Sequence, residues 1–191
     1  KNSIISVSCS GGEASLVSDI CKNISLKFPK FSKEKSTKIS KTLGELVKIS
    51  NPLDYHTFIW GNQKKMNELF VAICEKVNDL IIFVFDVPRN DRCDPTSFKC
   101  GIEAIIHAKK KTNAKIAVVS SISESMTEDL AEVFIKNQIL PLGGLKTGLR
   151  AIELSNKSFL FSKKVDFIKV LLEKRISQQN RRSLLEIDSK K

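Results

Sequence analysis

The sequence predicts an α/β fold in which a five-stranded parallel sheet, in the order 2-1-3-4-5, lies between two layers of helices. Two observations carry this prediction. Short apolar runs alternate with helical patterns along the 191 residues, and the run Leu80 to Phe85 is apolar at every position. A strand of that kind belongs in the middle of a sheet covered on both faces. We expect this domain at residues 1–155 and a helical linker at 156–191.

The opening elements follow from local patterns. Ile4 to Val7 is β-branched, and the segment after two glycines repeats apolar residues at helical spacing, which predicts a strand followed by a helix. A brief extended segment is expected at Ser25 to Phe28. A helix capped by Ser32 should run to about Leu43. A loop is expected from Asn51 to Asp54, because its proline lacks a backbone donor.

The middle of the chain carries the clearest helix. Asn62 can cap it, and its apolar residues recur at helical spacing: Met66, Leu69, Phe70, Ile73 and Val77. After the central strand we expect a polar loop at Asp86 to Asp94. A helix opened by Pro95 should extend to about Lys111, and a strand should follow at Lys115 to Val119.

The last part of the predicted domain contains two helices and one strand. Ser125 to Glu128 reads as a capping box that opens a helix. A short strand is expected at Gln138 to Leu140 and a final helix at Leu145 to Leu154. In the linker, an amphipathic stretch around Val165 to Leu172 precedes a polar segment and a second capping box, Ser183 to Glu186.

Composition narrows the classes of function. Hydrophobic residues make up 41% and charged residues 28%, which is globular usage. The longest apolar run is far shorter than the roughly 20 residues that span a bilayer, so a membrane span is excluded. The net charge is +11, but residues 156–191 hold ten Lys or Arg against four Asp or Glu, and therefore more than half of the excess. With one Trp and one Tyr, the chain has no basic and aromatic ladder, and solvated surface is favoured over nucleic-acid binding.

The cysteines indicate the compartment. There are five, and none is spaced as a close pair of metal ligands. This usage favours reduced thiols over a disulfide framework or a structural zinc. Since no leader-like segment precedes the first strand, we expect a cytoplasmic protein.

The join between the first strand and helix is the first candidate site. Ser10, Gly11 and Gly12 let the chain turn sharply and let a ligand approach the backbone, while the helix directs unsatisfied N–H groups to the same place. An anion site is one interpretation. The other is a tight turn whose glycines serve packing, with the dipole stabilising Glu13 in the first turn. Ligands of such sheets bind beyond the carboxyl ends of the strands, near the order reversal between strands 1 and 3.

Nucleophiles and acid-base residues are scarce. The chain has two histidines; His107 is expected at the surface, and His56 is better explained by a loop-ordering hydrogen bond than by catalysis. Asp54 fits a turn-forming role. Cys9 precedes the helix, where the dipole could lower its pKa, although a small buried residue is the commoner explanation.

The loop after the central strand contains Asp86, Asp91 and Asp94, which could ligate a divalent cation. Arg89 and Arg92 interrupt them, which favours an ionic or anion-facing loop. We therefore predict no metal site and no catalytic residue in this chain.

Taken together, the segments "CSGGEASLVSD", "NPLDYHTFIWG", "DVPRNDRCD" and "ILPLGG" resemble the nucleoside-diphosphate-forming acyl-CoA synthetases, which include succinyl-CoA synthetase and ADP-forming acetate-CoA ligases. The resemblance covers about residues 1–155 and implies their flavodoxin-like ligase domain. It implies an enzyme that joins a small carboxylic acid to CoA with ATP or GTP and Mg, through an acyl phosphate and a phosphohistidine.

The resemblance also implies roles for residues. A phosphate cradle would comprise Ser10, Gly11, Gly12 and the amides of Glu13 and Ala14. Substrate contacts would come from Cys9, Arg89, Asn90 and Asp91, although the family has Asn where this chain has Cys9. The family's loop beside the cradle matches Asn51, Pro52, Asp54 and His56.

The family's His-Thr-Gly-Ala motif, which carries the phosphoryl group, does not occur in this sequence. We therefore expect the chain to bind no cofactor itself and to be inactive alone. Its partners would be CoA-binding, phosphohistidine and ATP-grasp domains, on the same polypeptide or another subunit. Two alternatives remain: a flavodoxin-like module that binds flavin mononucleotide or another small phosphorylated ligand, and a basic module that binds RNA or a protein partner.

Overall fold

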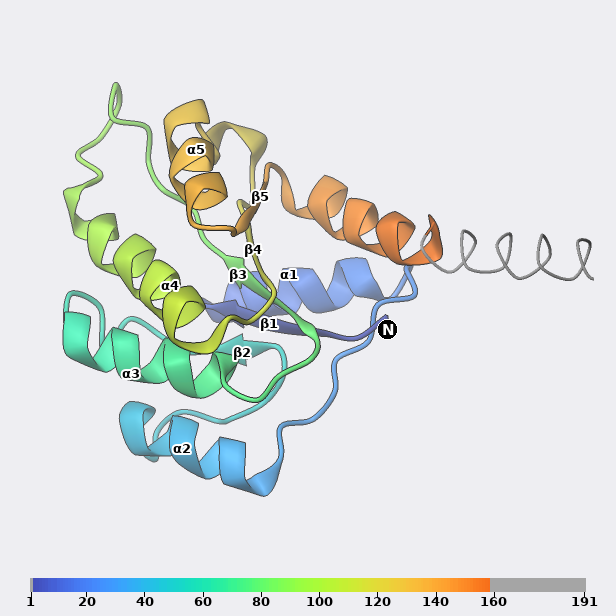
Figure 1. Cartoon of the computed structure of the whole chain (residues 1–191), viewed down its shortest axis with the longest axis vertical. Coiled ribbons are helices and arrows are strands. Elements are labelled where there is room, and N and C mark those ends of the chain that lie inside the picture. The colour runs from blue at the N-terminus through green and yellow to red at the C-terminus, as the bar shows by residue number, and fades with distance from the viewer. Residues whose placement is uncertain (1, 159–191) are drawn as a thin grey trace, which may run out of the picture. The chain divides into compact units, whose positions relative to one another are not determined.

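Residues 2–158 are described by the structure, a computed structural model, and within them five parallel strands form one sheet in the order β2-β1-β3-β4-β5 (Figure 1). The order and the flanking helices confirm the predicted fold class. The elements in chain order are β1 (Ile4–Ser8), α1 (Gly11–Cys21), α2 (Lys33–Leu43), β2 (Leu53–Asp54), α3 (Gln63–Cys74), β3 (Leu80–Val84), α4 (Lys99–Thr112), β4 (Ile116–Val119), α5 (Glu128–Lys136) and β5 (Leu140–Leu142). Residues 145–158 are also helical.

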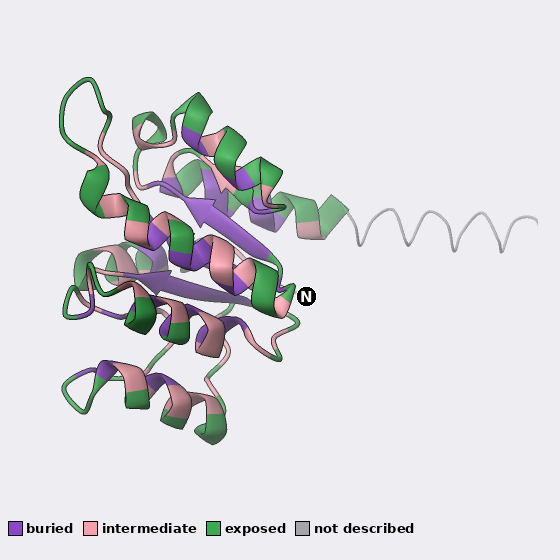
Figure 2. Cartoon of the chain, turned by 60° about the vertical axis from the view of Figure 1, so that its left-hand side comes forward, coloured by how far each residue is buried: buried purple, intermediate pink, exposed green. Residues whose placement is uncertain are grey.

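The two faces of the sheet bury separate apolar clusters, and the strands appear buried in Figure 2. On β3, Ile81 and Phe83 pack with residues of α2, α3, α4 and α5. The alternate residues Ile82 and Val84 pack with α1 and with the start of the helical segment 145–158. Neighbouring strand residues point to opposite faces, so a continuous apolar run serves both clusters.

The second strand is not where the sequence pattern placed it. Residues 25–28, predicted as a brief extended segment, make a single bridge between Ser3 and Lys27 and form no strand of the sheet. Residues predicted as loop form β2 instead, with Leu53 opposite Val7. A strand of two residues is too short to show any periodicity.

Helix caps decide most of the other boundaries. Ser32 and Asn62 cap α2 and α3 as predicted, by accepting hydrogen bonds from the backbone of Lys35 and Lys65. The predicted capping box at Ser125 to Glu128 is wrong, because Thr127 caps α5 and its Oγ1 accepts from Leu130 N at 3.4 Å. Here a cap two residues later opens the helix, after a short 3₁₀ turn.

The last strand also begins later than predicted, at Leu140 rather than Gln138. Gln138 has a φ of 58°, a left-handed conformation outside the strand region. None of the helices in residues 2–158 is long and apolar enough to cross a membrane. The predictions for Val165 to Leu172 and Ser183 to Glu186 lie outside the described residues, and the domain boundary at 155/156 stays a prediction.

Candidate functional site

The join between β1 and α1 lies at the carboxyl edge of the sheet, where the strand order reverses between β1 and β3. Ser10 is the N-cap, and its Oγ accepts from Gly12 N at 3.2 Å. Its carbonyl accepts from Ala14 N at 3.1 Å and from the Ser8 hydroxyl at 3.2 Å. Ser10, Gly11 and Gly12 are exposed, so the start of α1 is open to solvent.

Asp54 connects this join to the loop after β2. Its Oδ2 lies 3.2 Å from where a β-carbon on Gly11 would be. Its Oδ1 accepts from His56 N at 2.8 Å, which confirms the predicted turn-forming role. His56 Nδ1 lies 3.5 Å from Asp54 Oδ2, and the imidazole stacks on Phe58 at a centroid distance of 5.2 Å. Asp54 therefore orders the His56 loop beside the start of α1.

Acidic side chains surround the start of α1. Glu13 lies in its first turn, and its Oε2 is buried with no hydrogen-bond partner among the described residues. Burial, followed by the charges of Asp86 and Asp54, raises the pKa of Glu13 to about 7. At neutral pH this carboxyl is therefore divided between its protonated and charged forms. From the sequence alone, these three carboxyl groups were not predicted to lie close together.

Cys9 lies just before the join and is partly buried. Burial and the nearby Glu13 raise the pKa of its thiol to about 11. With its pKa raised and not lowered, the thiol is protonated at neutral pH and is no nucleophile there. This geometry therefore favours the interpretation of Cys9 as a small, partly buried residue.

Asn51 and Pro52 stand beside β1, further from its carboxyl end than Asp54. Asn51 Oδ1 accepts from Ser6 N at 2.9 Å, and Nδ2 donates to the carbonyls of Ile4 at 2.9 Å and Pro29 at 3.0 Å. The Asn51–Pro52 peptide bond is cis. The Asn51 amide thus takes the place of a strand partner along β1, while the side chain of Asp54 lies at the join.

In the loop after β3, each of the three aspartates has a different hydrogen-bond partner. Asp86 Oδ1 accepts from Ser121 N at 2.8 Å, and Asp94 Oδ1 accepts from Thr96 N at 2.9 Å. Asp91 is held by the guanidinium of Arg89. Among the described residues, no group of three or more His, Cys, Asp or Glu side chains could hold a metal ion.

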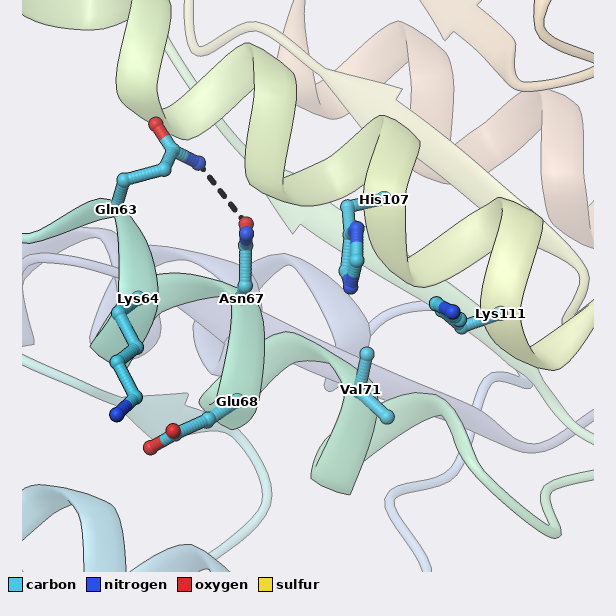
Figure 3. A pocket seen from close by; sticks show the side chains of 7 residues that line it. All are labelled: Gln63, Lys64, Asn67, Glu68, Val71, His107 and Lys111. Atoms are coloured by element: carbon cyan, nitrogen blue, oxygen red, sulfur yellow. Dashed lines mark hydrogen bonds between the residues drawn. The ribbon is translucent and has the colours of Figure 1, made fainter.

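Two pockets are lined in part by residues that the sequence had singled out. A pocket of about 230 Å³ is lined by Arg89 and Asn90 from this loop and by residues at the start of α5. A larger pocket of about 690 Å³, which was not predicted from the sequence, lies between α3 and α4 (Figure 3). Its lining residues are Gln63, Lys64, Asn67, Glu68, Val71, His107 and Lys111. His107, expected at the surface, is partly buried in its wall. The sequence signal for this pocket was the i, i+4 spacing of Gln63, Asn67 and Val71, which places the three side chains on one face of a helix.

No protein-family model matches the sequence, and a search of curated proteins finds no match. Solved structures do resemble the fold. The PH0766 protein of Pyrococcus horikoshii OT3 aligns with 80% of this chain and 34% of its own, with a TM-score of 0.63 and 17% identity. The "dinucleotide forming Acetyl-coenzyme A synthetase 1" of Ca. Korarchaeum cryptofilum, in complex with phosphate and ADP, aligns with 80% of this chain and 32% of its own, with a TM-score of 0.58 and 15% identity.

The apo form of the same synthetase gives a TM-score of 0.55 and 13% identity over the same shares of the two chains. At such identities the likeness shows the fold. The chain spans about a third of the length of these structures. Its fold is therefore similar to one part of an acetyl-coenzyme A synthetase.

Proposed function

We propose that this chain is the flavodoxin-like ligase domain of a nucleoside-diphosphate-forming acyl-CoA ligase. The whole enzyme would convert a carboxylic acid, CoA and ATP or GTP to acyl-CoA, ADP or GDP, and phosphate. The observation that carries the proposal is the likeness of 80% of the chain to a synthetase in complex with phosphate and ADP. The sequence segments that resemble the family support it, because three of them fall at the carboxyl edge of the sheet.

In this proposal the start of α1 receives the phosphoryl group that a histidine of a companion domain carries. The exposed residues Ser10, Gly11 and Gly12 leave room for it, and the positive end of the helix dipole favours it. The acidic side chains near the start of α1 set a condition for binding of the phosphoryl group. A phosphoryl group is repelled by Asp54 and Asp86, so its approach is favoured when Glu13 is protonated and able to donate a hydrogen bond.

Kinetics of the full-length protein that contains this segment test the proposal. A panel of carboxylic acids with CoA, Mg and ATP or GTP should give acid-dependent release of ADP or GDP and formation of acyl-CoA. The isolated 191-residue chain is the control, and we expect no ligation from it because it lacks the phosphohistidine motif. Acid-independent nucleotide hydrolysis, or none, would contradict the proposal. Stabilisation of the chain by flavin mononucleotide would favour the alternative flavin-binding module.

A further inference from the structure

The pocket of about 690 Å³ between α3 and α4 has the size of a small-molecule site (Figure 3). None of its lining residues belongs to the four segments that resemble the acyl-CoA synthetases. His107 and Lys111 lie in the last two turns of α4. Helices that follow parallel strands begin near the carboxyl edge of the sheet, so the end of α4 is remote from that edge. The pocket is therefore separate from the start of α1.

Side chains from both helices face each other across the pocket. On α3, Asn67 and Val71 are four residues apart and share one face of the helix. On α4, His107 and Lys111 have the same spacing. Figure 3 shows His107 and Lys111 pointing toward the side of α3 that carries Asn67 and Val71. Polar groups and an apolar side chain thus meet in one place.

The side-chain amide of Asn67 is held in one orientation. Its Oδ1 accepts from Gln63 Nε2 at 2.9 Å, and the same nitrogen of Gln63 donates to the Cys100 carbonyl at 3.2 Å. Because the amide oxygen already accepts this bond, Asn67 Nδ2 is the group left to bind something else. Gln63 therefore fixes which part of Asn67 a ligand would meet.

Three donor groups of the pocket make no hydrogen bond or ion pair within residues 2–158. They are Asn67 Nδ2, the His107 ring and the Lys111 ammonium. The imidazole carries at least one N–H in either protonation state, and the ammonium adds three donors and a positive charge. Glu68 also lines the pocket, but it extends away from His107, on the side of Lys64 (Figure 3). This set of donors favours a ligand with several acceptor oxygens and a negative charge.

We propose that this pocket binds a small organic anion. The carboxylate or phosphate group of the ligand accepts hydrogen bonds from Asn67, His107 and Lys111, and its apolar body lies against Val71. The inference does not rest on the proposed function, because no residue of the phosphate cradle takes part.

NMR titration of the 191-residue chain tests the charge and the apolar body of the ligand separately. Benzoate and phenyl phosphate carry both features, benzamide has the ring without the charge, and inorganic phosphate has the charge without the ring. Benzoate or phenyl phosphate should shift resonances of residues 67–71 and 107–111, and the tighter of the two identifies the anionic group. Benzamide and inorganic phosphate should bind at least severalfold more weakly.

Two variants test the donors. Asn67→Asp keeps an oxygen that can accept from Gln63, so the local structure is retained, but it removes the donor and adds a negative charge. Binding of the tighter probe should fall by more than about tenfold. Lys111→Gln should weaken binding on the order of tenfold, as loss of a hydrogen bond to a charged group predicts. Thermal melts check that both variants fold.

Lys110→Gln is the matched control, because Lys110 is the exposed neighbour of Lys111 and does not line this pocket. Its affinity for the probes should equal that of the unmodified chain. The proposal fails if no probe shifts these resonances, or if the shifts are confined to the start of α1. It also fails if benzamide or inorganic phosphate binds as tightly as the ring-bearing anions, or if Lys110→Gln and Lys111→Gln behave alike.

Discussion

Gly11 and Asp54 approach each other so closely that a β-carbon on Gly11 would lie 3.2 Å from Asp54 Oδ2. The contact joins the first turn of α1 to the end of β2, 43 positions apart in the numbering of the chain. Gly12, the next residue, is different: its β-carbon would meet Ser10 Oγ at 3.4 Å, an ordinary contact. Of the two neighbouring glycines, only Gly11 therefore lies where a side chain would crowd Asp54.

Gly11→Ala should push the Asp54 carboxylate away and loosen the His56 turn, and Gly12→Ala should not. We expect Gly11→Ala to lower ligase activity of the full-length protein at least severalfold, with stability changed by about 1 kcal/mol or less. Steady-state kinetics and urea unfolding measure the two effects. Equal activities of the two variants would show that the close approach has no functional role.

Glu13 should make stability depend on pH. Its pKa in the fold, about 7, exceeds its ordinary value of 4.5, so the folded protein binds this proton more tightly than the unfolded chain does. The resulting stability is fully present below pH 4.5 and is lost as the pH rises through 7. Glu13→Gln does not suffer this loss, and above pH 7 it should be more stable than the unmodified chain by on the order of 1 kcal/mol, after discounting for solvent screening.

Urea unfolding at pH 5 and pH 8 measures the effect of this variant. Glu128→Gln is the matched control, since Glu128 is an exposed glutamate in the first turn of another helix. A stability gain in Glu13→Gln that is the same at both pH values would rule out titration of Glu13 as the cause.

Lys35 should be more important for stability than its neighbour Lys38. Its ammonium donates to the carbonyls of Ala72, Ile73 and Glu75 at 2.8–2.9 Å and so satisfies the last turn of α3. Lys35→Met leaves these carbonyls without a donor and should lower the free energy of unfolding by about 2 kcal/mol.

Lys38 serves as the comparison because its ammonium pairs with the side chain of Glu75, whereas that of Lys35 bonds backbone carbonyls. Lys38→Met should cost less than about 1 kcal/mol. Chemical denaturation of both variants decides the matter, and equal losses would mean that the backbone contacts of Lys35 are not the source of its effect.

Thiol labelling should follow burial and pKa. Cys93 is exposed, whereas Cys9 is partly buried with a pKa of about 11 and Cys74 is buried with a pKa of about 12. Iodoacetamide at pH 8 should therefore modify Cys93 first and Cys74 last, because the thiolate is the reacting form. Mass spectrometry of timed digests gives the order, and labelling in urea is the control. Cys9 reacting as fast as Cys93 would contradict the burial described for the join.

The fold class, the central strand and the helices were predictable because their signals are local. The apolar run at Leu80 to Phe85 and the spacing from Met66 to Ile73 can be read from a few consecutive residues. The caps at Ser32 and Asn62 are local as well, since each bonds a residue three positions away. The turn at Ser10 to Gly12 was visible for the same reason.

Tertiary structure decided what depends on contacts between distant segments. β2 exists because Leu53 lies beside Val7 and the Asn51 amide bonds to β1, and no periodicity marks either. Glu13, Asp54 and Asp86 lie in three separate segments, and their mutual effect on pKa arises where the carboxyl ends of parallel strands meet. The turn for which the sequence offered an anion site as one of two interpretations lies among acidic side chains, because electrostatic interaction depends on distance in space and not along the chain.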